Sequence, residues 1–188
     1  MALLDAIICQ DWVYRYHSYN HDWSEDEEFF EMRNGEGDQV LILFRKDGTV
    51  INGFSADAEP QDKTKLTDGL PEAFHEFIFG EPVNSTGSTF CLWKLGNDQW
   101  TTGITNGQDD HSQELLSLLD GDPLSYVKWA SDYFKGTYHD SGISLATVTA
   151  VYNQQELNRE MVLSLVNELE DWEQLYEDLE EISYPYHI

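Results

Sequence analysis

His17 and His21 are the side chains whose types and spacing come nearest to a metal site in this sequence. Histidines four residues apart lie on one face of a helix, where both imidazoles reach a single metal ion. Asp22 follows directly, but no third ligand is evident, and the aromatic residues that alternate before His17 favour a strand or a loop. An enzyme or metal-binding protein with a pocket near His17 and His21 is therefore an alternative function. We expect no metal and no other cofactor.

Two further stretches resemble catalytic motifs without meeting their requirements. Gly35-Glu36-Gly37 lacks the later glycine of a phosphate-binding loop and precedes a predicted strand. His139-Asp140-Ser141-Gly142 contains three residue types of a hydrolytic triad, but triad members meet in space rather than as sequence neighbours. The sequence therefore assigns no catalytic residue, and we expect a protein that is not an enzyme.

The net charge is the most unusual property of the chain. It is −26, from 36 acidic against 10 basic residues. Such a surface repels phosphate backbones, which argues against direct nucleic-acid binding. It attracts a basic protein and accelerates the encounter, an advantage that salt removes. We therefore expect a non-enzymatic binding module: an inhibitor, an immunity-type protein or a nucleic-acid mimic that engages a basic partner.

Acidic residues are concentrated in the predicted last helix, residues 168–182. Its apolar residues Trp172, Leu175 and Leu179 recur on one side, where they hold the helix on the domain. The acids expected to face the basic partner are Glu170, Asp171, Glu173, Glu177, Asp178 and Glu181. The alternative is a solvated helix face whose acidity serves solubility alone.

A predicted hairpin over residues 37–54 is the centre of the fold. Its first run, Val40 to Phe44, is almost wholly apolar, as in a strand buried on both faces. Asp47-Gly48 is expected to form a type I′ turn, which needs positive φ at both central residues. A second hairpin joins residues 89–95 to residues 99–104 and is expected to place Trp93 opposite Trp100.

Capping residues mark the predicted helices. Ser24 and Glu27 have the spacing of a capping box, Leu70–Gly80 reads as a short helix, and Asp122-Pro123 opens a third helix. Residues 143–152 fit a strand or a helix, and Asn153 with Glu156 is expected to cap the helix that follows. The remaining aromatic alternation, Trp12 to Tyr19, is expected to be a strand with Trp12, Tyr14 and Tyr16 on one side.

These elements predict an α+β fold: an antiparallel or mixed β-sheet with helices packed on it and a helical C-terminal element. The length suits a single domain over residues 1–188, with a sheet-containing core over 1–152 and a two-helix C-terminal element over 153–188.

Several short motifs carry a resemblance to known families. An ensemble of them resembles a group of small acidic bacterial proteins of uncharacterised function: Met32 to Asp38, Leu70-Pro71 with Phe74 and Phe77, Gly121-Asp122-Pro123 with Trp129-Ala130, and Glu180 to Pro185. The stretch Leu70 to Phe77 is also similar to the Leu-Pro helix of the SUKH proteins, many of which are immunity factors against bacterial toxins. The resemblance implies an immunity-type role and assigns no functional residue.

The cysteines and the apolar runs bear on the location of the protein. Cys9 and Cys91 lie in apolar contexts and form no C-x-x-C motif, so we expect buried free thiols, which suits a reducing cytoplasm. No apolar run approaches the ~18 residues that a membrane span needs. We therefore expect a cytoplasmic protein that does not enter membranes.

Overall fold

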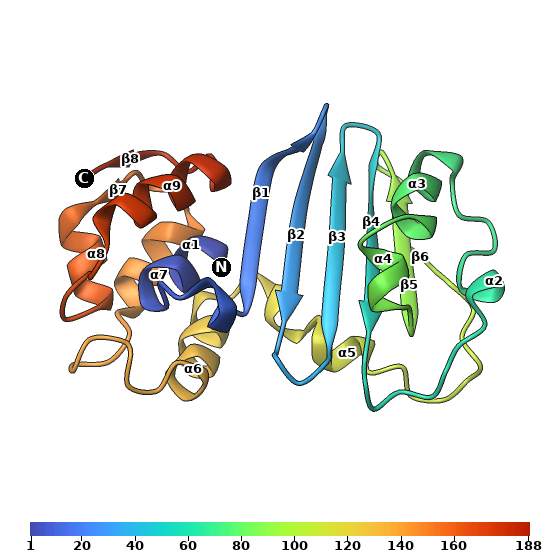
Figure 1. Cartoon of the computed structure of the whole chain (residues 1–188), viewed down its shortest axis with the longest axis horizontal. Helices are drawn as coiled ribbons and strands as arrows, with labels where there is room; N and C mark the ends of the chain where they lie inside the picture. The colour runs from blue at the N-terminus through green and yellow to red at the C-terminus, as the bar shows by residue number, and fades with distance from the viewer. The chain divides into compact units, whose positions relative to one another are not determined.

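The computed structural model describes all residues from 1 to 188, and their contacts gather into two compact units (Figure 1). One unit, here called the helical unit, contains Met1–Asn20 and Leu118–Ile188; the other, the sheet unit, contains His21–Ser117. The prediction of an α+β fold with a helical C-terminal element is confirmed. That residues 1–188 form a single domain stays a prediction.

The sheet is a meander of six strands in the order of the sequence. Neighbouring strands from β2 onward are antiparallel (Figure 1). The strands are β1 (His17–Ser24), β2 (Glu27–Arg33), β3 (Gln39–Arg45), β4 (Gly48–Phe54), β5 (Phe90–Leu95) and β6 (Thr101–Thr102). Short loops join β1 through β4 and join β5 to β6, because antiparallel neighbours need only hairpin connections, whereas residues 55–89 form a long connection from β4 to β5.

The predicted hairpin over residues 37–54 is confirmed as β3 and β4, but its turn lies one residue earlier than expected. Arg45 is opposite Gly48, so the loop is Lys46-Asp47, and neither residue has positive φ. The type I′ prediction is therefore wrong. Gly48 belongs to β4, where a Cβ atom would lie 2.2 Å from the Lys94 carbonyl oxygen of β5. The glycine thus permits close strand packing rather than a left-handed turn.

The predicted capping box at Ser24 and Glu27 is wrong, because the two residues flank a hairpin turn. Ser24 ends β1, Glu27 begins β2, and Asp26 between them has φ 61°. Aspartate tolerates this left-handed conformation better than most residues. Phe29 is paired opposite Leu43 on β3 and is buried, and that non-local packing prevails over the local capping signal.

The second hairpin is confirmed, but its tryptophans do not face each other. Trp93 of β5 is opposite Thr101 and only 4% exposed. Trp100 lies just before β6, is 45% exposed, and has the Lys94 ammonium 5.2 Å from its ring centroid. The predicted cross-strand pair is therefore wrong, since the register places the two rings in different environments.

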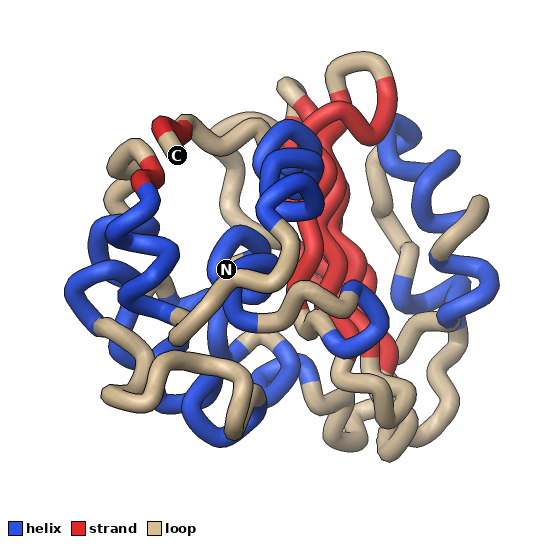
Figure 2. The backbone as a smooth tube through the Cα atoms, turned by 60° about the vertical axis from the view of Figure 1, so that its left-hand side comes forward, coloured by secondary structure: helices blue, strands red, loops and turns tan.

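Short helices cover one face of the sheet in the sheet unit (Figure 2). They are α2 (Lys63–Leu66), the 3-10 turn η2 (Glu72–Phe74), α3 (His75–Phe79) and α4 (Val83–Thr86); α5 (Ser112–Leu115) follows β6. The predicted helix at Leu70–Gly80 is thus present as η2 and α3. Its Phe74, Phe77 and Ile78 pack with Leu41 and Val50 of the sheet, the contact that fixes these helices in place.

The helical unit has its own core, built from both ends of the chain. Its elements are α1 (Ala2–Ile8), η1 (Trp12–Tyr14), η3 (Ser117–Asp120), α6 (Pro123–Tyr133), α7 (Leu145–Tyr152), α8 (Arg159–Leu165) and α9 (Trp172–Ile182), with a two-strand parallel ladder of β7 (Leu157–Asn158) and β8 (Tyr186–His187). Every residue of α1 is buried, and α1 packs against α8 and α9 (Figure 1).

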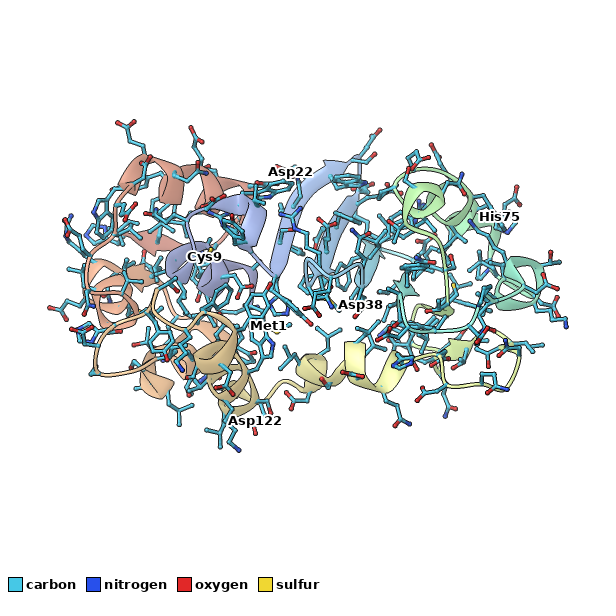
Figure 3. All side chains as sticks on the ribbon, turned by 60° about the horizontal axis from the view of Figure 1, so that its bottom comes forward. Met1, Cys9, Asp22, Asp38, His75 and Asp122 are labelled. Carbon is cyan, nitrogen blue, oxygen red and sulfur yellow. The ribbon has the colours of Figure 1, made fainter.

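Helices α6, α7 and α8 of this unit begin at side-chain caps, with one correction to the predictions. Asp122, labelled in Figure 3, caps α6 as predicted by accepting a hydrogen bond from the Leu124 amide. The ambiguous residues 143–152 form α7, capped by Ser144. The cap predicted at Asn153 is wrong: Asn158 caps α8, because residues 157–158 first pair with β8. Cys9 and Cys91 are free and buried, as expected.

The close approach of the Lys94 backbone to Gly48 leads to a testable prediction. Gly48→Ala forces the new Cβ against the Lys94 backbone, and we expect it to lower the free energy of unfolding by about 2–3 kcal/mol. Gly96→Ala is the control, because its Cβ meets no atom within 4 Å and it bears only the left-handed backbone cost of about 1 kcal/mol. Urea unfolding measures both, and equal losses would contradict the steric role of Gly48.

The burial of the Cys91 thiol leads to a second prediction, which concerns the free energy of unfolding at alkaline pH. Burial raises its pKa from 9.0 to about 12. Its contribution to stability is fully present below pH 9 and is lost as the pH rises toward 12, because the unfolded thiol ionises first. Between about pH 8 and about pH 10 the wild type should lose about 1.4 kcal/mol more stability than Cys91→Ala. Equal losses in urea titrations of the two proteins would show that this thiol does not ionise on unfolding.

Candidate functional site

Helix α9 is amphipathic, with a buried apolar side and an acidic exposed side. Asp171 caps it by accepting hydrogen bonds from the Glu173 and Gln174 amides at 2.9 and 3.0 Å. Leu175 and Leu179 have no exposed surface and belong to the core of the helical unit. These contacts fix the orientation of the helix, so its remaining side chains have a defined direction.

The exposed side of α9 and the residues just before it carry carboxylates only. No lysine or arginine occurs between residues 167 and 182. The exposed acids are Glu168, Glu170, Asp171, Glu173, Glu177, Glu180 and Glu181. Like charges spaced by three or four residues on a helix destabilise it by a few tenths of a kcal/mol per pair. The structure therefore keeps a negative surface here at a small cost in stability.

Asp178 is the exception, and the prediction that it faces a partner is wrong. It is 6% exposed and forms a bidentate ion pair with Arg15, with Nη1–Oδ1 at 2.6 Å and Nη2–Oδ2 at 2.7 Å. Its position explains the burial, because Asp178 follows Leu175 by three residues and precedes Leu179 on the buried side. The helical period of the sequence was thus a signal for its burial. The sequence carried no comparable signal that Arg15, the partner of Asp178, is buried.

Residues 10–20 run along α9 and contact it at three successive points. At the start of the helix the Gln10 side chain donates to the Asp171 carbonyl and accepts from the Asp171 amide. In the middle is the Arg15–Asp178 pair. Near the end the Asn20 amide donates to the Glu181 carboxylate at 3.1 Å. The segment and the helix therefore form one surface.

Between the first two contacts, the segment forms the turn η1 and exposes three large side chains. Trp12, Val13 and Tyr14 are 55, 68 and 66% exposed. The Asp11 carboxylate closes the turn by accepting from the Val13 amide at 3.1 Å. The strand predicted over Trp12 to Tyr19 is therefore wrong as far as Tyr16, because the Asp11 side chain favours a turn locally. The strand begins only at His17.

His17 lies in a buried hydrogen-bond cluster, not in an accessible site. The Asp5 Oδ2 atom accepts from the His17 backbone amide at 2.8 Å and lies 2.9 Å from His17 Nδ1. Tyr126 donates to Asp5 Oδ1 at 2.7 Å, and burial, aided by the Asp5 charge, raises the pKa of Tyr126 well above its ordinary value. Asp5 and His17 are 0 and 2% exposed. The cluster joins α1, the start of β1 and α6.

His21 is placed differently from His17, so the two histidines do not form the metal pair that the alternative function would need. Both lie on β1, and residues four apart on a strand are about 13 Å apart. His21 lines a cavity of about 390 Å³ together with Asp22, whose position is labelled in Figure 3. The basic side chains of the cavity are engaged by acids: Arg45 by Glu27 and Asp47, and Lys46 by Asp26. Nowhere in the chain do three histidine, cysteine or acidic residues gather as metal ligands would.

Two further observations bear on the functional class. No helix of the structure has both the length and the apolar character that crossing a bilayer requires. Comparison of the chain with protein-family models, with curated proteins and with solved structures finds no match. The site must therefore be interpreted from its own chemistry.

The burial of Asp178 leads to a prediction that its substitution affects stability more than substitution of its exposed acidic neighbours does. Asp178→Ala leaves the Arg15 guanidinium buried without its carboxylate, and we expect a loss of about 3–5 kcal/mol in the free energy of unfolding. Glu177→Gln, one residue away and exposed, should change it by less than about 0.5 kcal/mol. Urea unfolding measures both. Similar effects from the two substitutions would contradict the structural role of the ion pair.

Proposed function

We propose that this protein is a non-enzymatic binding module that engages a basic protein through the acidic surface of α9. The observation that carries the proposal is the arrangement of that helix. Its apolar side is buried and Asp178 is held by Arg15, while Glu170, Glu173, Glu177 and Glu181 remain exposed with no base among them. A fixed row of carboxylates is a preorganised surface for cations.

The physical effect of such a surface is chiefly on the encounter. Exposed charges steer an oppositely charged partner and raise the association rate, whereas dissociation depends more on buried contacts. Because the scaffold holds the helix, little ordering entropy is lost on binding. The same negative potential opposes phosphate backbones, so the partner is a protein rather than a nucleic acid.

The proposal includes the immunity-type, inhibitor and nucleic-acid-mimic roles, which share this chemistry. Free thiols at Cys9 and Cys91 suit a reducing compartment such as the cytoplasm, where we place the module. Two alternatives remain distinct from it. In one, the acids serve solubility alone; in the other, the cavity beside His21 binds a small ligand or a metal.

Matched charge removal distinguishes a site on α9 from general acidity. One variant carries glutamines at Glu170, Glu173, Glu177 and Glu181. The control removes the same number of charges from exposed acids of the sheet unit, by amides at Asp57, Glu59, Asp68 and Asp98. The probe is fluorescent decalysine, titrated by anisotropy at several salt concentrations.

We expect the α9 variant to bind decalysine roughly tenfold more weakly at low salt, with a flatter salt dependence, because exposed pairs contribute about 0.2–1 kcal/mol each. The control variant should bind nearly as the wild type does. Equal losses in the two variants would mean that total charge alone attracts the probe, which supports the solubility alternative and contradicts the proposal.

A further inference from the structure

We infer that the turn η1 is the specificity element of this same surface and that the partner segment is rich in arginine. The guanidinium groups stack on Tyr14 and Trp12 while their charge is met by the α9 carboxylates. This inference rests on the proposed function, because it assigns the chemistry of the partner that α9 attracts. It adds an aromatic contact to what is otherwise a charge-only surface.

The turn η1 exposes three consecutive large side chains. Scattered single apolar residues on a surface need no explanation, but contiguous ones mark interaction sites. Trp12, Val13 and Tyr14 are consecutive, and each keeps more than half of its surface exposed. Tryptophan and tyrosine are also the residues that most often dominate binding energy at protein interfaces.

The turn η1 is also held rigidly in place. It is closed from within by Asp11 and held from both sides by the Gln10–Asp171 and Arg15–Asp178 contacts. The Arg15 guanidinium also donates to the Cys9 and Gln10 carbonyls at 2.9 and 3.2 Å. The aromatic rings are thus presented on a fixed backbone directly beside the acidic helix.

Charge complementarity selects the occupant. The turn lies next to exposed carboxylates at Asp11 and Asp171, and its only cation, Arg15, is buried on Asp178. A second copy of a chain with net charge −26 would be repelled, as would an anionic lipid surface. A cationic peptide segment is attracted to the carboxylates and to the ring faces.

Arginine fits this surface better than lysine does. Its planar guanidinium stacks on aromatic rings and forms bidentate bonds with carboxylates at the same time. The helical unit already contains such a stack, since the Arg159 guanidinium lies 4.2 Å from the ring centroid of Trp172 at the start of α9. Lysine offers only a point charge, which the carboxylates alone attract.

The test compares decaarginine with decalysine, both fluorescent, on the full chain by anisotropy. Trp12→Leu/Tyr14→Leu removes the rings and keeps apolar side chains, while Trp12→Phe/Tyr14→Phe keeps the rings. Trp100→Leu is the control for an exposed tryptophan of the sheet unit. The substituted side chains are exposed, and equal melting temperatures confirm that each variant is folded.

We expect the wild type to bind decaarginine roughly tenfold more tightly than decalysine. The leucine variant should lose that preference by weakening decaarginine alone, whereas the phenylalanine variant and Trp100→Leu should keep it. No preference in the wild type, or a preference that survives in the leucine variant, would overturn the inference. Decalysine binding that is indifferent to the α9 charges would instead count against the proposed function, so the two failures are distinguishable.

Discussion

The buried ion pair between Arg15 and Asp178 is the interaction on which the surface of the helical unit depends. Burying two charges costs several kcal/mol per ion unless each finds good partners. The structure meets this condition with a bidentate pair and with two backbone carbonyls that accept two further Arg15 donors. Residues 10–20 are consequently fixed along α9, and the exposed turn η1 is held beside the acidic side of that helix.

The buried acids of the helical unit differ in role from the exposed ones. Asp5 and Asp178 are enclosed and hydrogen-bonded: Asp5 ties α1 to the start of β1 and to α6, and Asp178 ties Arg15 to α9. The acids on the outer side of α9 make few contacts and leave their charge in solvent. On α9 the exposed acid Glu177 is therefore followed directly by Asp178, a buried acid with a structural role.

The sheet unit follows a different constraint, which is the close approach of neighbouring strands. Gly48 lies where β4 meets the Lys94 backbone, and Gly53 lies where a Cβ would meet the Phe90 ring at 1.9 Å. A side chain at either position would push β4 away from the Lys94 backbone or from the Phe90 ring of β5. The strand register that results also leaves Trp100 outside the core, with Lys94 over its ring.

The sequence by itself determined the α+β class, the apolar strands of the central hairpin, the Asp122 cap and the acidic run of α9. These features depend on residues close in sequence, whose periodicity and local hydrogen bonds act in any context. Only the tertiary structure decided that Ser24 and Glu27 flank a hairpin, that Asp178 is buried and that Trp12 to Tyr14 are exposed. The first two outcomes depend on a partner distant in sequence, Leu43 for Phe29 and Arg15 for Asp178, and packing against that partner outweighs the local preference. The third combines a local turn closed by Asp11 with distant contacts on either side of it, from Gln10 to Asp171 and from Arg15 to Asp178.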